Sequence, residues 1–293
     1  MIFRLERCGM KFGHIGDLHI GKRVHDFSML EDQRYILNQM IKIFEEQKVD
    51  GVLIAGDVYD KTVPSAEAVQ LFDEFITGLA KAKIPVYMIS GNHDSSERLS
   101  FGRNLFKRSN LYIASQFNQE IEKITIKEDG YNINFYMLPF VKPAYINHVL
   151  KIQTETYEEC FEHLMEQVKI NEDETNILLA HQFVTAGKNS PELSDSETSS
   201  LGGIDNIDYR LFDAFDYVAL GHIHKPQQVI PGLAAYAGAL EPTDKNDTGK
   251  HGFIRGEISE RGTRFEFVPL AKREYLHLVL ETESRMGNAE VRE

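Results

Sequence analysis

Residues 50–60 read DGVLIAGDVYD, and this stretch decides the fold class. Its first part, Asp50 to Ile54, is a short apolar run rich in β-branched residues, which predicts a buried strand. A glycine and an aspartate, Gly56 and Asp57, follow that strand almost at once. Similar apolar runs, each followed by a polar cluster, recur at residues 84–89 (IPVYMI), 176–180 (NILLA) and 215–220 (FDYVAL).

Amphipathic segments lie between these predicted strands. Apolar residues recur at helical spacing in three sets: Leu37, Met40, Ile41 and Phe44; Ala68, Leu71, Phe72, Phe75 and Leu79; and Tyr157, Phe161, Leu164, Met165 and Val168. Two hairpins are predicted around Asp129-Gly130 and Arg261-Gly262. Strands that alternate with helices predict a layered α/β fold, and the hairpins make it mixed rather than purely parallel.

Composition narrows the class of protein. The chain has 293 residues, of which 42% are hydrophobic and 26% charged, and it contains no apolar run of the roughly 20 residues that a membrane span needs. The opening residues lack the apolar run of a signal peptide, so we expect a cytoplasmic location. The two cysteines, Cys8 and Cys160, indicate neither a disulfide framework nor a thiolate metal site. A net charge of -13 indicates that any DNA contact is local.

Five polar clusters carry the chemistry. Because the carboxyl ends of strands in an open α/β sheet converge on one crevice, we expect these clusters to meet in space. Two pairs of side chains, in Asp17-x-His19 and His222-x-His224, are expected to point to one side of an extended segment. The clusters are Gly16-Asp17-Leu18-His19, Gly56-Asp57-Val58-Tyr59-Asp60, Gly91-Asn92-His93-Asp94, Ala180-His181-Gln182 and Gly221-His222-Ile223-His224.

The whole set, rather than any single string, predicts a metal site. Short strings such as D-x-H and NHD occur by chance, but four histidines at strand ends do not: His19, His181, His222 and His224. The glycine before each cluster is expected to allow a sharp turn and to leave room for substrate. Asp57 can bridge two cations, one on each of its oxygens. The remaining histidines considered are interpreted as ordinary core or surface residues: His14, His25, His148, His163 and His277.

The order and spacing of the clusters resemble the calcineurin-like metallophosphoesterases, whose signature is D-x-H, GD, GNH(D/E), a lone His and GHxH. More narrowly, six strings within residues 10–270 resemble the SbcD branch of the Mre-type DNA double-strand-break repair nucleases. They are GDLHIGKR, GDVYDKTVPS, GNHDSSERLSFG, HQFVTAG, SETSSLGGIDNID and FDAFDYVALGHIHKPQ, and the last three are specific to that branch. The resemblance implies a four-layered sandwich of two mixed β-sheets flanked by helices.

The resemblance also implies roles for individual residues. His93 would lie beside the scissile phosphate, where it stabilises charge or protonates the leaving oxygen. Asp60 departs from the pattern, since archaeal and eukaryotic relatives carry histidine there, and no catalytic role is assigned to it. The implied ligands are Asp17, His19, Asp57 and His224 for one metal ion, and Asp57, Asn92, His181 and His222 for the other. Ligand chemistry allows manganese, iron or zinc, and the resemblance favours two manganese ions.

The implied function is a manganese-dependent DNA nuclease, acting as a 3'-to-5' exonuclease on duplex ends and as an endonuclease on single strands and hairpins. The implied partners are DNA, an SbcC-like SMC-type ATPase and a second copy of the chain in a homodimer. Two alternatives stay open, because a fold and a metal site do not name a substrate. One is an enzyme for small phosphodiesters or phosphoproteins, and the other is a scaffold that binds DNA ends without cutting.

Several further predictions concern the rim of the site and the domain limits. Four basic residues near the first and third clusters could hold the DNA backbone or could be ordinary surface: Lys22, Arg23, Arg98 and Arg103. Residues 185–206 predict a long loop that is functional or mobile. The expected organisation is an extension at 1–9, a nuclease domain at 10–272, and the start of a capping domain or a tail at 273–293.

Overall fold

The first sheet is built mainly from the amino-terminal half of the chain. The structure is a computed structural model that describes residues 9–24, 27–128, 131–187, 190–193, 206–243, 247, 249–270 and 272. Four strands are parallel: β1 (Met10–Ile15), β4 (Gly51–Ala55), β5 (Val86–Ile89) and β6 (Leu111–Ala114). The antiparallel hairpin of β15 (Gly252–Ser259) and β16 (Gly262–Pro269) joins β1, which gives the order β16-β15-β1-β4-β5-β6.

The second sheet also has six strands and is also mixed. Its order is β13-β14-β12-β9-β8-β7, antiparallel at its two outer pairs and parallel between. The strands are β7 (Glu122–Glu128), β8 (Tyr131–Leu138), β9 (Thr175–His181), β12 (Tyr217–Gly221), β13 (Gln227–Ile230) and β14 (Ala234–Tyr236). Two short pairs lie outside these sheets: β2 (Arg23–Val24) with β3 (Phe27–Ser28), and β10 (Val184–Thr185) with β11 (Ile207–Asp208).

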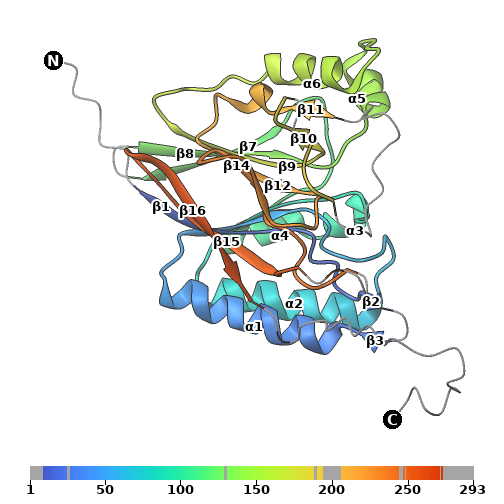
Figure 1. The fold of residues 1–293 in the computed structure, drawn as a ribbon, viewed down its shortest axis with the longest axis vertical. Coiled ribbons are helices and arrows are strands. Elements are labelled where there is room, and N and C mark those ends of the chain that lie inside the picture. The colour runs from blue at the N-terminus through green and yellow to red at the C-terminus, as the bar shows by residue number, and fades with distance from the viewer. Residues whose placement is uncertain are drawn as a thin grey trace, which may run out of the picture.

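Helices cover the outer face of each sheet (Figure 1). The first sheet carries α1 (Leu30–Glu46) and α2 (Ala66–Lys81), and the second carries α5 (Pro143–Leu150) and α6 (Tyr157–Glu166). The Ser65 hydroxyl caps α2 by accepting a hydrogen bond from the Ala68 N–H. The shorter helices are α3 (Ser96–Leu99), α4 (Arg103–Phe106), η1 (Lys107–Ser109) and η2 (Tyr209–Phe212).

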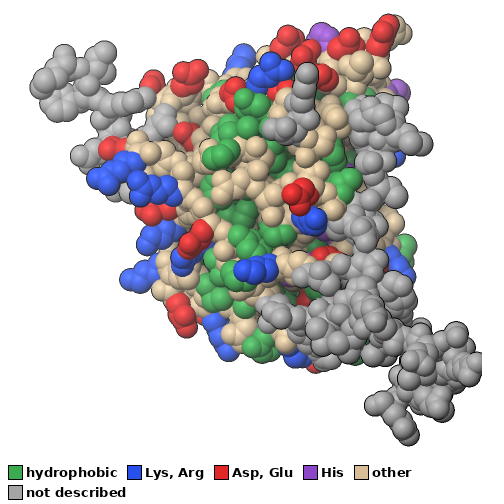
Figure 2. All heavy atoms as spheres, in the orientation of Figure 1, with side chains coloured by type: hydrophobic (Ala, Val, Ile, Leu, Met, Phe, Trp, Pro, Cys, Tyr) green, Lys and Arg blue, Asp and Glu red, His purple; other side chains and the backbone are tan. Residues whose placement is uncertain are grey.

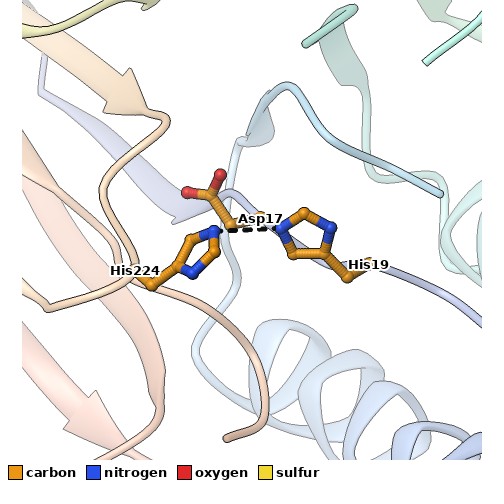
Figure 3. A group of neighbouring side chains, drawn as sticks. All are labelled: Asp17, His19 and His224. Carbon is orange, nitrogen blue, oxygen red and sulfur yellow. Dashed lines mark hydrogen bonds between the residues drawn. The ribbon is translucent and has the colours of Figure 1, made fainter. Parts of the chain in front are cut away.

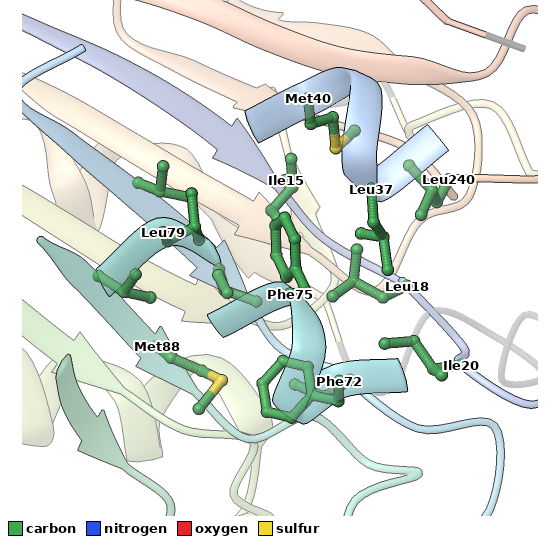
Figure 4. Packing of buried hydrophobic residues seen from close by; sticks show 14 of the residues in the cluster. Ile15, Leu18, Ile20, Leu37, Met40, Phe72, Phe75, Leu79, Met88 and Leu240 are labelled. Carbon is green, nitrogen blue, oxygen red and sulfur yellow. The ribbon is translucent and has the colours of Figure 1, made fainter. Parts of the chain in front are cut away.

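Three apolar clusters fill the spaces between four layers. One lies between the first sheet and its helices, where Phe72 and Phe75 of α2 and Met40 of α1 pack beside Ile15 and Met88 (Figure 4). A second joins the other sheet to α5 and α6, and a third lies between the two sheets. The layers bury apolar surface on both faces of each sheet. The predicted four-layered α/β sandwich is therefore confirmed.

Local predictions differ from the structure in small ways. Helix α6 ends at Glu166, so Val168 lies beyond it, although its side chain still packs against the core. The hairpin turn between β15 and β16 is at Glu260 and Arg261, as expected. The predicted loop at 185–206 begins at the last residue of β10 and ends just before β11, and these two strands pair with each other.

Other predictions fall outside the described residues. These are the turn at 129–130, His25, His277, the inner part of the 185–206 loop at 188–189 and 194–205, and the segments 1–8 and 273–293. The predicted domain limits stay predictions. Among the described helices, none is long and apolar enough to cross a bilayer.

Candidate metal centre

The predicted ligands lie where strands of both sheets end. Asp17, Asp57 and Asn92 follow β1, β4 and β5 of the first sheet, while His181 ends β9 and His222 follows β12 of the second. Strand β4 of the first sheet contacts the neighbouring strands β9 and β12 of the second sheet across the sandwich. The expectation of convergence within one open sheet was wrong in this respect, since two packed sheets each supply part of the site.

The backbone of the site departs from extended geometry. Asp17, His19 and Asp57 have φ angles of 49°, 42° and 51°, and His222 has 100°. The expected extended segments at Asp17-x-His19 and His222-x-His224 are therefore wrong, because these residues lie in turns beyond β1 and β12. Left-handed backbone is costly for residues with a side chain and collects at functional sites. Hydrogen bonds hold it here, from the Asp17 N–H to Gly56 O at 3.1 Å and from the His19 N–H to Asp57 O at 3.0 Å.

Asp17, His19 and His224 form a first group of ligand-type side chains (Figure 3). The Nε2 atoms of His19 and His224 face each other at 3.1 Å. Both oxygens of the Asp17 carboxylate accept from the His222 N–H, at 3.0 and 3.1 Å. This contact ties the turn after β1 in one sheet to the turn after β12 in the other.

A second group lies around Asn92. The Asn92 Oδ1 atom is 3.0 Å from His181 Nε2 and 3.0 Å from His222 Nδ1. His181 Nδ1 donates to the Ala55 carbonyl at 2.7 Å, so its Nε2 presents a lone pair to the group. A ligand histidine whose other nitrogen donates to a carbonyl is typical of metal sites.

Asp57 connects the two groups through one oxygen. Its Oδ2 atom lies 3.8 Å from His19 Nε2 and 3.5 Å from His181 Nε2. Its Oδ1 atom accepts a hydrogen bond from the His93 N–H at 2.8 Å. The geometry therefore favours a single-oxygen bridge, whereas the sequence-based expectation was one cation on each oxygen.

The spacing and charge of these atoms fit cations. When one ion binds two ligand atoms at right angles with bonds of about 2.1 Å, the two ligand atoms are about 3 Å apart. The His19–His224, Asn92–His181 and Asn92–His222 atom pairs described above are separated by nearly that distance. Burial lowers the pKa of His181, but the Asp57 carboxylate raises it more, to about 9, because the lone pair at Nε2 faces oxygen atoms. A metal cation bound between His181 Nε2 and the Asp57 carboxylate would interact with the lone pairs of both groups and would take the place of the proton on His181.

Unlike His181, the histidines on the other side of Asp57 are already in the neutral form that binds metal. Burial lowers the pKa of His19 to about 3 and that of His224 to about 4, so both rings are neutral at pH 7. Burial alone would raise the pKa of Asp57, but the nearby His181 and His19 hold it well below its usual range. Neutral imidazoles and an ionised carboxylate are the forms that bind metal.

His93 has a different environment from the ligand histidines. Its Nδ1 donates to the Asp60 carbonyl at 2.9 Å, and its ring lies edge-on to His19 with 4.8 Å between centroids. This arrangement leaves Nε2 available on a half-buried ring at the rim of the site. Asp60 therefore positions His93 through its backbone, while its carboxylate pairs with Lys22 Nζ at 3.1 Å.

The structure places the four predicted DNA-contacting residues in unequal settings. Lys22 lies next to the site in its pair with Asp60, and Arg103 pairs with Glu122 at 3.5 Å. Arg23 on β2 and Arg98 on α3 are exposed. Their contact with DNA stays a prediction.

Two residues that support the site had no role in the sequence-based interpretation. The buried Asp94 carboxylate accepts from the N–H groups of Val58, Tyr59 and Gly91 at 3.1, 3.0 and 2.9 Å, which fixes the Asp57 turn to the Asn92 turn. Burial, assisted by the charge of Asp57, raises its pKa to about 6. Phe140 packs against the His222 ring with 6.2 Å between centroids. A supporting role for Asp94 could have been predicted from its position as the fourth residue of the Gly91-Asn92-His93-Asp94 cluster. No sequence pattern around Phe140 indicates that it contacts the site.

Known proteins provide an independent comparison. The family model described as Calcineurin-like phosphoesterase matches residues 10–226. A dimetal phosphatase from Danio rerio has a similar structure, with a TM-score of 0.52 and 14% identity over 91% of this chain and 98% of its own, which indicates a shared fold. The NAD nucleotidase from Haemophilus influenzae has a TM-score of 0.45 and 15% identity over 90% of this chain and 56% of its own. Because the matched residues make up most of the chain and include the whole candidate metal centre, the protein belongs to the calcineurin-like phosphoesterase family.

Proposed function

We propose that the chain is a manganese-dependent DNA nuclease of the SbcD type, a 3'-to-5' exonuclease on duplex ends and an endonuclease on single strands. One observation carries the proposal: Asp57 Oδ2 faces His19 on one side and His181 on the other, between two groups of ligand-type atoms. Family membership supplies metal-dependent hydrolysis of phosphoesters. The choice of DNA is supported by the three branch-specific strings in the sequence.

The chemistry divides between the metal ions and the chain. Two divalent ions held by the two groups would activate water and stabilise charge on the phosphoryl oxygens. His93 is aimed by the Asp60 carbonyl, so its Nε2 can donate to the phosphate or to the leaving oxygen. Asn92 is exposed at the surface of the site, which leaves an approach for a large substrate.

The ligand types support manganese. Carboxylate and amide oxygens combine with four imidazoles in the two groups, and this set contains no thiolate. Magnesium prefers oxygen ligands and keeps several waters, so a site so rich in nitrogen suits manganese better. An SbcC-like SMC-type ATPase is the partner we propose, on the resemblance alone.

A pocket beside the metal centre favours a second candidate. A 360 Å³ pocket opens next to Asn92 and is lined in part by Phe140, Tyr145 and Lys142. Its aromatic walls and its cation could hold a nucleoside or an aryl group attached to a small phosphodiester. The second candidate is therefore hydrolysis of a small phosphodiester, with no need for a polymer.

A single set of assays separates the candidates. The full chain is freed of metal by chelation, and manganese or magnesium is added back. Labelled single-stranded, hairpin and duplex DNA are then compared with an aryl phosphodiester. Asp57→Asn, prepared in parallel, controls for contaminating nucleases, since it weakens both metal groups. DNA cutting that depends on manganese supports the nuclease, and turnover of the aryl ester alone supports the second candidate. Full activity in excess chelator would refute both.

A further inference from the structure

Helix α1 buries an amide side chain on its apolar face. Gln33 is fully buried and lies one helical turn before Ile36 and Leu37, where the apolar stripe of the helix continues. Figure 2 shows acidic and basic side chains along the lower edge of the molecule, where α1 and α2 lie in Figure 1, so the polar face of the helices points outward. An apolar side chain is the usual choice on the buried face. A buried amide costs free energy unless its polar atoms have partners, so the partners of Gln33 indicate its role.

The partners of Gln33 lie in the turn that follows β1. Its Nε2 atom donates to the Leu18 carbonyl at 3.2 Å and to the His19 carbonyl at 2.9 Å. Its Oε1 atom accepts from the Gly21 N–H at 3.0 Å. The His19 carbonyl also accepts from the Lys22 N–H at 2.9 Å, within the turn itself. Because an amide has two N–H donors and one acceptor oxygen, these bonds fix its orientation and use both donors.

This turn carries two candidate metal ligands on a strained backbone. Asp17 and His19 have φ angles of 49° and 42°, in the left-handed region. Leu18 and Ile20 pack into the core between the first sheet and its helices, close to Leu37 of α1 (Figure 4). Residues of the turn therefore alternate between the site and the core. A left-handed backbone at residues with a side chain persists only where surrounding contacts hold it.

Hydrogen bonds hold both peptide groups that flank His19, each at its two ends. In the peptide group before His19, the N–H donates to the Asp57 carbonyl at 3.0 Å and the Leu18 carbonyl accepts from Gln33. In the peptide group after it, the Ile20 N–H donates to a carbonyl of the turn after β4 at 2.9 Å, and the His19 carbonyl accepts from Gln33. The turn after β4 thus binds the N–H groups, and α1 binds the carbonyl groups. The direction of the His19 side chain is fixed between these two elements.

We propose that Gln33 is a positioning residue for the candidate metal ligand His19. Its amide contacts the backbone of His19 rather than the ring, so it acts through the ligand and not on the ion. The Nε2 atom of His19 lies 3.1 Å from His224 Nε2 and 3.8 Å from Asp57 Oδ2, so a rotation of either flanking peptide group moves it out of the first group. The second group, around Asn92, is held by other turns and strand ends. The inference rests on the two-metal site of the proposed function, and it does not depend on DNA as the substrate.

Removal of the amide at nearly constant size tests this role. Gln33→Met leaves the Leu18 and His19 carbonyls without their donor from α1. We expect one of two manganese ions to bind about 10-fold to 100-fold more weakly, the usual effect of losing a contact that orients a ligand. Gln33→Glu keeps an acceptor for the Gly21 N–H but loses at least one donor, so it should weaken the same ion by a smaller factor.

Asn134→Leu is the matched control. Asn134 is also fully buried, and its amide forms hydrogen bonds with Thr125, Glu174 and Asn176. It lies on β8 opposite the start of β9, whereas the candidate ligand His181 is at the other end of that strand. This variant loses a buried amide with as many hydrogen bonds as that of Gln33, so a general loss of stability would affect both. It should bind both ions like the natural chain.

The measurement is a manganese titration of the metal-free full chain, in which the free ion is quantified from its electron paramagnetic resonance signal. Thermal melts verify that each variant folds. Natural affinity for both ions in Asn134→Leu, with one natural and one weakened ion in Gln33→Met, supports the proposal. Natural affinity for both ions in Gln33→Met, an equal loss for both ions, or the same loss in Asn134→Leu would each overturn it. If Gln33→Met does not fold, Gln33→Glu decides by the same outcomes.

These outcomes are independent of the substrate. A natural chain that binds two ions but does not cut DNA removes only the nuclease and leaves the role of Gln33 to the titration. Fewer than two bound ions in the natural chain would overturn the two-metal site and the role of Gln33 with it.

Discussion

His93 differs from the other histidines of the site in what its second ring nitrogen meets. Its Nδ1 donates to the Asp60 carbonyl, as that of His181 does to Ala55. Within the described residues its Nε2 makes no hydrogen bond, whereas His19, His181, His222 and His224 each direct a ring nitrogen toward another ligand-type atom within 3.1 Å. Its ring also lies within the wider group that contains His19 and Asp57. Two roles are therefore possible for His93, metal binding and the proposed action on the phosphate, and a variant can separate them.

The first prediction tests that separation. His93→Ala is expected to retain both metal ions but to lose about 100-fold to 10,000-fold in turnover, the usual contribution of general acid catalysis. Metal content by mass spectrometry is measured beside turnover of an aryl phosphodiester. His163→Ala is the control, because that exposed ring lies on α6 and pairs with Glu166 of the same helix. Loss of metal from His93→Ala would instead make this residue a ligand.

A second prediction concerns His14, which is fully buried and lies in the core. Its Nε2–H donates to the Leu220 carbonyl at 3.1 Å and its Nδ1 accepts from the Tyr217 hydroxyl at 2.9 Å, so the neutral ring satisfies both bonds. Burial lowers its pKa from 6.5 to about 3. Above about pH 6.5 neither state binds the proton, whereas between about 6.5 and 3 only the unfolded chain does. The contribution of His14 to the free energy of unfolding is therefore fully present above about pH 6.5, and it decreases as the pH is lowered from about 6.5 to about 3.

The slope from His14 reaches about 1.4 kcal/mol per pH unit. Urea unfolding between about pH 6.5 and pH 4 measures it, and His14→Gln should remove that part of the slope. His163→Gln, at an exposed position, should not alter it. An unchanged slope in His14→Gln would show that His14 is not the group responsible.

At the level of elements, two of the glycines before the clusters leave space for neighbouring residues of the site rather than for substrate. A Cβ atom on Gly91 would overlap with Asp57 Oδ1, and one on Gly221 would overlap with the Ala55 carbonyl. The expectation that these glycines leave room for substrate was therefore wrong at these two positions. At Gly16 a Cβ atom would meet only Gly221 Cα at 3.5 Å and the Ala55 residue at 3.6 Å or more, which are ordinary contacts.

The third prediction compares Gly91→Ala with Gly16→Ala. The Gly91 variant must displace the bridging carboxylate, and we expect its metal affinity to fall by about 10-fold to 100-fold, as when supporting contacts of a ligand are lost. Gly16→Ala should bind metal like the natural protein. Titration calorimetry of the metal-free variants provides the comparison, and equal affinities would show that the Asp57 turn can move at little cost.

The strand ends also show how far sequence can predict such a site. Apolar runs located β4, β5, β9 and β12, because buried strands in a parallel arrangement are continuously apolar. The polar residues that follow those runs were therefore expected to meet. The contacts between the sheets could not be predicted, since they depend on packing of β4 against β9 and β12, which are distant in sequence. The left-handed turns at Asp17 and His19 also escaped prediction, because tertiary hydrogen bonds impose them.

At the scale of the whole molecule, the charge of the chain affects the proposed DNA binding more than hydrolysis of a small ester. The net charge is -13, and among the four predicted DNA-contacting cations Lys22 pairs with Asp60 and Arg103 pairs with Glu122. The ligand-type atoms that support hydrolysis are all present in the described part of the chain. A small ester needs little beyond them, whereas a long DNA gains affinity with each phosphate that a cation neutralises.

The last prediction follows from that contrast. We expect turnover of an aryl phosphodiester to change little between about 50 and 200 mM salt, while DNA cleavage below saturation falls steeply. The slope of log affinity for duplex DNA against log salt should match at most about four neutralised phosphates, one for each predicted DNA-contacting cation, and fewer if the ion pairs of Lys22 and Arg103 persist. Arg98→Ala should reduce this slope by about one if Arg98 contacts a phosphate, and Arg261→Ala in the hairpin turn between β15 and β16 should not. Salt-resistant, processive degradation of blunt duplex by the isolated chain would contradict this prediction. Such activity would require a DNA affinity that a chain with a net charge of -13 is not expected to have.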